Sequence, residues 1–520
     1  MKRRPHILWA DDEIDLLKPH ILFLEGKGYD VTGVPDGASA IELLDEEVVD
    51  LVFLDENMPG ITGLETLQKI KARRPHLPCV MITKSEEEHI MEEAIGGKIS
   101  DYLIKPLNPN QILMSAKKIL DERKLVESKA MMDYQREFRE LGIRLGDRLD
   151  ASDWEDIHRR LVHWDIELSD IGDEAMLEIL GMQRSDANRQ FCRFVDNEYA
   201  DWVSGGGDRK DHPILAPDVL SGSVRPLLKE GKKVLFVLID NFRYDQWQAV
   251  SGEISKSMRI VSEQIQWSFL PTATQYARNA IFAGQTPAKI VAETPHLWKW
   301  EDEKGSKNAH EEELLKRQLA AWRFDGNWSY HKITDKEGGE KLVTGFHRIK
   351  AQDFTAVVYN FVDMLSHMRT ESNIIKELAA DEAAFRSITE SWFDHSPLKQ
   401  LLELAAESGI EVILTTDHGT IQVDNAIKVH GEREVTSNPR YKSGKTLNSD
   451  SKDIIEVSNP ADFGLPKQHA ATRYLFATSR DFMVYPNNFN SFASRLRDSF
   501  QHGGVSMEEM LVPLIHLRGR

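Results

Sequence analysis

Cysteine is nearly absent from this chain of 520 residues, which contains only Cys79 and Cys192, far apart in the sequence. A disulfide-stapled fold needs several paired cysteines, and a thiolate zinc site needs them in closely spaced motifs. Both are therefore excluded as the organising feature of the protein. Such sparse cysteine is typical of proteins in a reducing compartment, so we expect a cytoplasmic location.

Long apolar runs and an excess of basic residues are also lacking. No run reaches the roughly 18 apolar residues of a membrane-spanning helix, and acidic residues enter MKRRPHILWADDE before a signal-peptide core can form. The formal net charge is −19, with 84 acidic and 65 basic residues. Because such a surface repels a phosphate backbone, and because a basic recognition helix is missing, we expect no direct reading of DNA. Because long apolar runs are lacking, we expect no membrane span.

The chain does contain enough apolar residues, 41% of the total, for three domains with their own cores. Residues 1–122 alternate short apolar runs with amphipathic stretches, which predicts an α/β domain with a doubly wound parallel sheet. Residues 123–203 lack proline and place apolar side chains three and four apart, which predicts a central helical bundle or linker. After a glycine-rich break at 204–212, residues 214–520 return to the α/β pattern.

Polar residues follow the apolar runs of the first domain, where the carboxyl ends of parallel strands meet at one edge. Carboxylates gathered there repel each other unless a cation lies between them, and Mg²⁺ prefers such oxygen ligands. Asp55 is then placed to accept a phosphoryl group, with Lys105 balancing its charge and Thr83 bonding a phosphate oxygen. The alternative is that these carboxylates only cap helices. The acidic residues are Asp11, Asp12 and Asp55.

The segments ADDE (10–13), LDENMPG (54–60), IT (82–83) and LIKP (103–106) resemble the signature of two-component receiver domains, and the resemblance covers residues 5–121. It implies phosphorylation of Asp55 by a cognate sensor histidine kinase and an aromatic switch at Tyr102. It also implies Mg²⁺ ligands and phosphate contacts, which are Asp11, Asp12, Asp55 and the Asn57 carbonyl for the metal, and Thr83 and Lys105 for the phosphate.

Candidate metal ligands gather at the ends of apolar runs in the C-terminal domain. KKVLFVLID ends in Asp240, EVILTTDHG carries Asp417 and His418, and TAVVYNFVD ends in Asp363, four residues before His367. With the late His502, the inventory is three carboxylates and three imidazoles, which suits two Zn²⁺ ions and leaves one ligand position open for a hydroxyl. For any single Asp–His pair, an ordinary loop is the alternative interpretation.

Two hydroxyls are available to fill that position. Thr272 and Thr274 lie in PTAT directly before an expected helix, whose N-terminus favours an arriving phosphate. Arg243 and Arg278 are candidate phosphate contacts. For each of them, an arginine on a helix surface is an alternative of equal weight. Four tryptophans in an apparent insertion at 295–342 either stack nucleobases or pack a small core of their own. They are Trp298, Trp300, Trp322 and Trp328.

The stretches PTxTxxARxAIFAG and HGGVSMEEMLVPL resemble the PglZ-domain branch of the alkaline phosphatase superfamily over residues 214–520. In related phosphodiesterases and sulfatases the nucleophile lies ten residues before a glycine that closes the following helix. Counting back from Gly284 gives Thr274, with Thr272 in reserve. The resemblance implies one zinc on Asp240, Thr274, Asp417 and His418, and a second on Asp363, His367 and His502.

Taken whole, the order of receiver, helical linker and PglZ domain resembles that of PorX-type response regulators of the type IX secretion system. The resemblance implies an extracytoplasmic-function sigma factor as a partner and a homodimer on phosphorylation. We expect a response regulator, phosphorylated on Asp55, whose output is a zinc-dependent phosphodiesterase acting on nucleotides or oligonucleotides. The alternative is a non-catalytic signalling adaptor whose phosphorylation-dependent dimer binds a sigma factor or secretion component.

Overall fold

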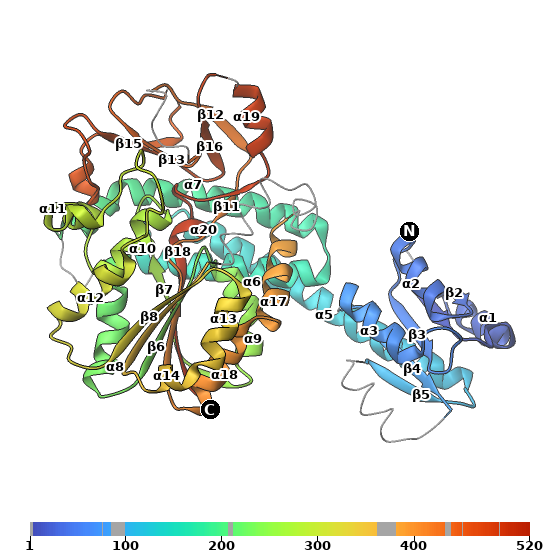
Figure 1. Cartoon of the computed structure of the whole chain (residues 1–520). Coiled ribbons are helices and arrows are strands. Elements are labelled where there is room, and N and C mark those ends of the chain that lie inside the picture. Colours follow the sequence, from blue (N-terminus) through green and yellow to red (C-terminus); the bar gives the residue numbers. More distant parts are fainter. Residues whose placement is uncertain are drawn as a thin grey trace. The chain divides into compact units, whose positions relative to one another are not determined.

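The computed structural model describes residues 4–74, 76–84, 99–205, 212–360, 381–431, 438–449, 451–487 and 489–520. The chain forms two compact units, residues 1–137 and 138–520 (Figure 1). Helix α5 (Pro109–Arg144) is continuous from the first into the second. Asp363 and His367, two of the expected zinc ligands, lie outside the described residues.

The first unit contains a parallel five-stranded sheet in the order β2-β1-β3-β4-β5. Its strands are β1 (His6–Ala10), β2 (Asp30–Val34), β3 (Leu51–Asp55), β4 (Cys79–Thr83) and β5 (Asp101–Ile104). Its helices include α1 (Lys18–Gly26), α2 (Gly37–Glu46), α3 (Gly63–Arg73) and the first part of α5. The strand order reverses between β1 and β3, which is where an open α/β sheet places its site.

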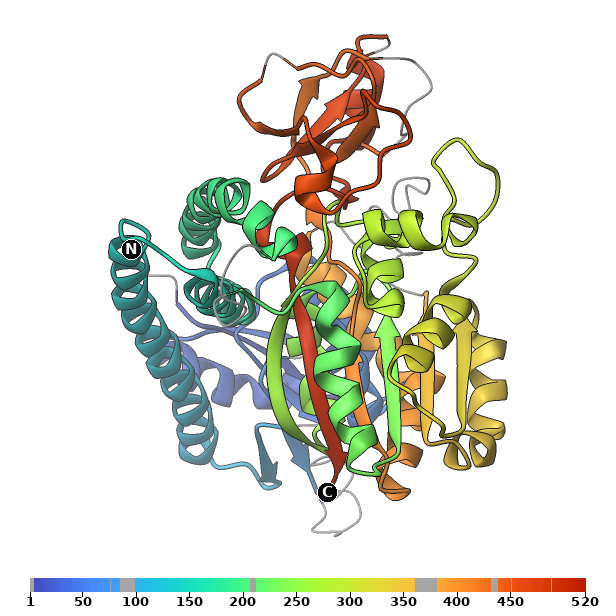
Figure 2. The same ribbon diagram turned by 90° about the vertical axis from the view of Figure 1, so that its left-hand side faces the viewer.

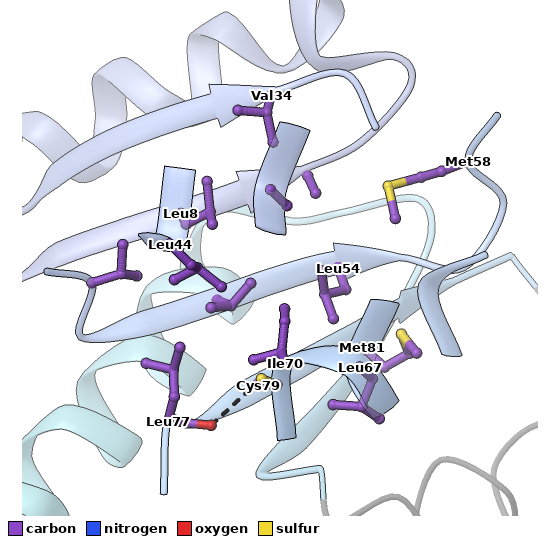
Figure 3. Close-up of a cluster of buried hydrophobic side chains, with 14 residues drawn as sticks. Leu8, Val34, Leu44, Leu54, Met58, Leu67, Ile70, Leu77, Cys79 and Met81 are labelled. Carbon is purple, nitrogen blue, oxygen red and sulfur yellow. Dashed lines mark hydrogen bonds between the residues drawn. The ribbon is translucent and has the colours of Figure 1, made fainter. Parts of the chain in front are cut away.

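Alternate side chains of the first strands enter different cores, as the two-residue period of a strand requires. Leu8 and Ala10 pack with Leu44 of α2 and Leu67 of α3 in one cluster (Figure 3). Ile7 and Trp9 belong to a second cluster, which also contains side chains of α1 and α5. Helices therefore cover both faces of the sheet, and the predicted doubly wound architecture is confirmed.

The second unit is built on a six-stranded sheet in the order β7-β18-β10-β6-β9-β8. Strands β10, β6, β9 and β8 are parallel, whereas β18 runs antiparallel to both β10 and β7. The strands are β7 (Met258–Trp267), β18 (Leu511–Gly519), β10 (Glu411–Thr415), β6 (Val234–Ile239), β9 (Phe354–Tyr359) and β8 (Trp328–Ile333). Every residue of β6, β9 and β10 is buried, which explains their continuous apolar runs.

Helices cover both faces of this sheet (Figure 1). The described helices of this unit, besides the end of α5, are α6 (Ala151–Ile171), α7 (Glu174–Ser204), α8 (Arg225–Lys229), α9 (Tyr244–Ile254), α10 (Thr274–Ala283), α11 (Pro287–Glu293), α12 (Glu311–Ala321), α13 (Lys336–Thr344), α14 (Phe346–Lys350), α17 (Glu382–Asp394), α18 (Pro397–Glu407), α19 (Phe489–Leu496) and α20 (Met507–Met510). None of the helices described is both long enough and apolar enough to cross a bilayer.

The helical segment expected at 123–203 forms two long helices, α6 and α7, besides part of α5. Asp150 caps α6 through the backbone N–H of Asp153, and α6 ends at Gly172 in the left-handed conformation. The pair packs on the C-terminal domain through aromatic rings, with Trp267 of β7 5.4 Å from Phe191 and 5.1 Å from Trp202. The linker helices and the C-terminal α/β domain therefore share one hydrophobic core.

Two stretches expected to continue the α/β pattern instead form small sheets outside the main one. Strand β15 (Arg473–Ala477) pairs antiparallel with β13 (Tyr441–Gly444) and β14 (Ile454–Val457), and β16 (Asp481–Val484) pairs with β12 (Asn425–Lys428). A further pair joins β11 (Ile421–Gln422) to β17 (Phe500–Gln501). These sheets, in orange and red at the top of Figure 2, have small apolar clusters of their own.

Part of the region 295–342, which the sequence suggested to be an insertion, belongs to the main sheet. It contains α12 and the edge strand β8, which pairs in parallel with β9 along its whole length. Trp298 is buried and its ring lies 5.3 Å from that of Tyr276. An edge strand is only half buried, so charged residues alternate with its apolar ones. For this reason the sequence did not reveal that this region belongs to the main sheet.

Candidate metal and phosphoryl-transfer sites

The first candidate site lies at the carboxyl edge of the N-terminal sheet. Asp11 follows β1 and Asp55 ends β3, and both are buried, while Asp12 is exposed. The three carboxylates offer oxygens within 4.8 Å of one another. The Lys105 amine lies 2.9 Å from Asp11 and 2.7 Å from Asp55, so a cation already bridges the two buried acids.

The electrostatics of this site favour additional positive charge. Burial, reinforced by Asp11, raises the pKa of Asp55 even though Lys105 and the Asn57 N–H oppose the shift. Burial also opposes ionisation of Lys105, but its hydrogen bonds to Asp55 and Asp11 raise its pKa. The all-oxygen donor set and the raised pKa of Asp55 fit a divalent cation such as Mg²⁺.

The remaining positions expected in this site surround the acids. The Asn57 backbone N–H donates to Asp55 over 3.1 Å, and Thr83 is buried at the end of β4. Tyr102 is 39% exposed on the edge strand β5. A side chain at Gly63 would place its Cβ 2.3 Å from the Asp55 carbonyl oxygen, so this glycine lets α3 begin directly against the acceptor loop.

The second candidate site lies at the carboxyl edge of the main C-terminal sheet. Asp240 follows β6, and Asp417 with His418 follows the end of β10, its parallel neighbour. All three are buried and offer ligand atoms within 4.8 Å of one another. The structure therefore brings together three of the sequence-predicted ligands.

Two histidines of this site stack on each other. The rings of His418 and His502 lie 4.2 Å apart and nearly parallel, at 14°. The Nδ1 atom of His418 lies 3.0 Å from the Gly419 carbonyl, and that of His502 lies 3.1 Å from the Thr272 carbonyl. Since a carbonyl only accepts, both Nδ1 atoms carry a proton, and in the neutral form of each ring Nε2 is the atom with the lone pair, as in metal-binding histidines.

The two candidate nucleophiles differ in what their hydroxyls do. Thr274 begins α10, and its Oγ1 lies 3.1 Å from Nε2 of His418. The Thr272 hydroxyl is fully buried, where it donates to the Gly504 carbonyl over 2.8 Å and accepts from the Gly503 N–H over 3.0 Å. Thr272 thus holds the loop that carries His502, and Thr274 is the hydroxyl placed beside the ligand set.

Arg278, expected as a phosphate contact or a helix-surface arginine, is fully buried among carboxylates. Its guanidinium pairs with Asp240, lies 3.0 Å from Asp417 and lies 3.4 Å from Glu311. Burial opposes ionisation of Asp417, but the charge of Arg278 and the Asn241 N–H help to offset it, and the pKa of Asp417 is lowered. The site is thus built to hold ionised carboxylates around positive charge.

Carboxylates engage the guanidinium of Arg243, which was expected as a phosphate contact or a helix-surface arginine. Its Nε donates to Asp245 over 2.8 Å, and Nη1 lies 3.8 Å from Glu382. Two further arginines complete a ring in which each guanidinium contacts two carboxylates. The members of this ring, termed the ionic ring below, are in order Asp165, Arg184, Glu382, Arg243, Asp245 and Arg386.

A cleft of about 530 Å³ opens in front of Thr274 and His502. Besides these two residues, Gln275, Asn308 and Arg495 lie on its walls. The walls also include Ala273, Glu301, Lys307, Asn438, Pro439, Tyr441, Leu496 and Gln501. None of the four tryptophans singled out by the sequence contributes to the described lining, so nucleobase stacking on them is not supported.

Several residues of the site escaped the sequence analysis. Glu311, at the start of α12, contacts Arg278 inside the carboxylate cluster. Glu509 pairs with Arg440 and accepts from the Gly504 N–H over 2.9 Å, which fixes the loop after His502. Sequence alone gave no signal for them, because Glu311 lies in the supposed insertion and Arg440 in a stretch typical of a surface loop.

Sequence comparisons match the three parts of the chain. Residues 219–517 match the BREX system PglZ alkaline phosphatase-like domain, residues 124–203 the PorX response regulator linker domain, and residues 7–117 the response regulator receiver domain. A receiver domain implies a cognate kinase as partner. The PglZ match indicates a hydrolase fold of a superfamily that typically depends on metal ions.

Among individual relatives, several response regulators match about a quarter of the chain. The alginate biosynthesis transcriptional regulatory protein AlgB of Pseudomonas putida is 34% identical over 119 residues, 23% of this chain and 27% of the relative. The response regulator SaeR of Staphylococcus aureus is 29% identical over 119 residues, 23% of this chain and 52% of the relative. This chain thus spans about a quarter to a half of the length of these curated relatives.

Solved receiver domains cover a similar share of the chain. One is a CheY-like response regulator receiver domain protein from Methanospirillum hungatei, with 27% identity, a TM-score of 0.23, and 23% of this chain and 96% of that chain covered. Another is the receiver domain of NtrX from Brucella abortus, with 30% identity, a TM-score of 0.21, and coverages of 22% and 98%. Since the PglZ model matches more than half of the chain and a receiver and a PorX linker precede it, the chain belongs to the PglZ family of alkaline phosphatase-like proteins, as a response regulator of the PorX type.

Proposed function

We propose that the C-terminal domain is a zinc-dependent phosphodiesterase acting on nucleotides or oligonucleotides, with Thr274 as the nucleophile. The observation that carries this proposal is the placement of the Thr274 hydroxyl 3.1 Å from Nε2 of His418, beside Asp240 and Asp417. A purely structural metal site needs neither a hydroxyl among its ligands nor an adjoining cleft.

The donor set fits zinc, since carboxylates and neutral imidazoles with directed Nε2 lone pairs are its usual ligands in hydrolases. Asp240, Thr274, Asp417 and His418 would hold one ion, and His502 would hold a second with Asp363 and His367. Zinc bound there would supply Lewis-acid chemistry that favours the ionised threonine hydroxyl and a phosphoryl group of reduced negative charge.

The chain's own residues would then perform the remaining tasks. The Thr274 oxygen attacks phosphorus and displaces one ester oxygen, which leaves as an alcohol with the threonine proton, and water then hydrolyses the phosphothreonine bond. The N-terminus of α10, at which Thr274 lies, attracts the phosphate. In the described lining of the cleft, the Lys307 amine donates to the carbonyls of Trp300 over 2.5 Å and Glu301 over 3.0 Å. The described lining holds two cations, Lys307 and Arg495, and one carboxylate, Glu301, and this small net positive charge suits a singly charged diester more than a doubly charged monoester.

In the receiver, we propose a magnesium site formed by Asp11, Asp12, Asp55 and the Asn57 carbonyl, with Asp55 accepting a phosphoryl group from a sensor histidine kinase. Thr83 and Lys105 would contact that group. Phosphorylation would favour a homodimer through the receiver. In the cell, this regulator would control type IX protein secretion together with an extracytoplasmic-function sigma factor, from a cytoplasmic location.

A non-catalytic signalling adaptor is the second candidate, and one observation favours it. Arg278 already neutralises Asp240 and Asp417, so these carboxylates have a partner without any metal. In that case the receiver-dependent dimer would bind a sigma factor or secretion component, and the cleft in front of Thr274 would hold no reacting substrate.

One experiment separates the two candidates. The purified protein is loaded with Zn²⁺, its metal content is measured, and hydrolysis of bis-p-nitrophenyl phosphate is compared with that of p-nitrophenyl phosphate. We expect about two zinc ions per chain and preferential cleavage of the diester, both lost after chelation. A protein that binds no zinc after loading and hydrolyses neither ester would support the adaptor.

A further inference from the structure

We propose that helix α7 of the linker is a structural part of the hydrolytic site, in which Tyr199 and Asn188 position the loops that carry Thr274 and His502. This inference rests on the proposed phosphodiesterase function. Four residues of α7, separated by four, four and seven positions, form one stripe along the helix. They are Arg184, Asn188, Cys192 and Tyr199, and each contacts the C-terminal α/β domain.

Tyr199 supports the loop that leads to the nucleophile. Its hydroxyl accepts a hydrogen bond from the Leu270 N–H over 2.9 Å, four residues before Thr274. The ring is fully buried and lies 5.2 Å from that of Phe463 and 6.0 Å from that of Phe269. Packing fixes the ring, and the hydroxyl fixes the backbone at the point where the chain turns toward α10.

Asn188 supports the C-terminal end of the loop that carries His502. Its Oδ1 accepts from the Met507 N–H over 2.8 Å, and its Nδ2 donates to the Glu508 carboxylate over 2.9 Å. This amide is buried, so the two contacts satisfy both of its ends. In Figure 1, α20, which begins at Met507, lies next to α7.

The same short segment touches the Asp417–His418 strand end. The Gly419 N–H donates to the Glu509 carbonyl over 3.0 Å, and a Cβ at Gly419 would lie 2.0 Å from the Glu508 carbonyl oxygen. Glu508 and Glu509, next to the contact with Asn188, are therefore packed directly against Gly419, the residue that follows His418. A displacement of α7 would move both histidine-bearing segments.

The two remaining stripe residues extend the contact. Cys192 donates from Sγ to the Val505 carbonyl over 3.1 Å, within the loop after His502. Arg184 belongs to the ionic ring, which also contains Arg243, three residues after Asp240. Helix α7 therefore contacts the nucleophile loop and the loop of His502 directly, and it is connected to the segments of His418 and Asp240 through Glu508 and the ionic ring. Small shifts of a reacting group are costly to catalysis.

Tyr199→Phe tests the proposal, because it keeps the packed ring and deletes only the hydroxyl that binds the Leu270 N–H. We expect kcat for the diester to fall about tenfold with KM and zinc content close to those of the wild type. In metal-free protein, we expect faster hydrogen exchange of the Leu270 amide. Tyr485→Phe is the matched control, because the buried Tyr485 hydroxyl has no hydrogen-bond partner among the residues that the structure describes, and we expect wild-type values from it.

Asn188→Ala is the second variant and acts on the other loop. It should lower kcat similarly and speed exchange of the Met507 amide, with little change at Leu270. Wild-type kcat and wild-type exchange in both variants would overturn the proposal. If the zinc-loaded wild type itself is inert, the proposed phosphodiesterase fails, and exchange in the metal-free variants alone decides whether α7 orders the two loops.

Discussion

The Thr274 hydroxyl lies 3.1 Å from Nε2 of His418, whereas the Thr272 hydroxyl, two residues earlier, is bonded to the backbone of Gly503 and Gly504. The two threonines of PTAT therefore have separate tasks. Thr272 joins the nucleophile loop to the loop of His502, and Thr274 faces the histidine that would bind metal. This difference allows their variants to be distinguished by experiment.

Thr272→Val should act mainly on stability. It leaves the buried Gly503 N–H and Gly504 carbonyl without their partner, and such a loss costs about 1–3 kcal/mol. We expect denaturant unfolding of the metal-free protein to show this decrease, and Thr274→Val to show a smaller one. Equal destabilisation by the two variants would contradict the assignment of Thr272 as a loop anchor.

Arg278→Met should make the metal-free protein unstable and strongly dependent on metal. Three buried carboxylates, Asp240, Asp417 and Glu311, would lose their shared cation, and removal of one partner from such a buried group costs about 3–5 kcal/mol. Added Zn²⁺ should then raise the melting temperature more in this variant than in the wild type.

The exposed Arg317 of α12 offers the control for this substitution, since Arg317→Met removes the same charge without touching the carboxylates. We expect it to leave stability and the response to Zn²⁺ unchanged. An Arg278→Met protein as stable as the wild type without metal would show that the guanidinium does not neutralise this cluster.

His158 should make the second unit less stable as the pH falls below about 6.5. Burial, reinforced by Arg184, Arg159 and Arg243, lowers its pKa from 6.5 to about 3 despite the opposing charge of Asp245. Between these two values the unfolded chain binds a proton that the folded chain does not, so unfolding is favoured by roughly 1.4 kcal/mol per pH unit.

Denaturant unfolding at pH 6.5 and pH 5 measures this loss, which we expect to be about 2 kcal/mol from His158 alone. His158→Gln cannot be protonated, so the variant should lose about that much less than the wild type over the same interval. An identical pH dependence of wild type and variant would mean that His158 is protonated in the folded protein.

Acyl phosphate formation at Asp55 should change the association state. Beryllofluoride with Mg²⁺ mimics the phosphorylated carboxylate, adds negative charge beside Lys105 and Thr83, and should draw the half-exposed Tyr102 inward. We expect light scattering to show a shift from monomer toward dimer, and no shift in Asp55→Ala. A molar mass that is the same with and without the mimic would refute the dimer.

The fold was predictable wherever strands are buried on both faces. Their continuous apolar runs can be recognised in the sequence, as for β1, β3, β4, β6, β9 and β10. The polar residue after each run marks the carboxyl edge of a sheet. For this reason Asp11, Asp55, Asp240, Asp417 and His418 could be grouped into two sites from the sequence alone.

The other features of the fold and of the sites could not be predicted, because they depend on contacts between residues far apart in the chain. Nothing local distinguishes Arg278, buried among three carboxylates, from an arginine on a helix surface, or Arg243 in the ionic ring from a phosphate ligand. Strand β8 was hidden because an edge strand carries polar residues on one face. The stripe on α7 looked like an ordinary amphipathic pattern, since a helix that packs on another domain and one that packs in its own bundle have the same periodicity.

The most direct test of the account compares zinc-loaded wild type with Thr274→Val in the hydrolysis of bis-p-nitrophenyl phosphate, with zinc content measured in the same samples. Valine keeps the size and branching of the side chain and removes the attacking oxygen. We predict that the variant retains most of its zinc and loses at least about 10³-fold in kcat, because positioning and electrostatic stabilisation alone remain. Hydrolysis by Thr274→Val at the wild-type rate would contradict the account.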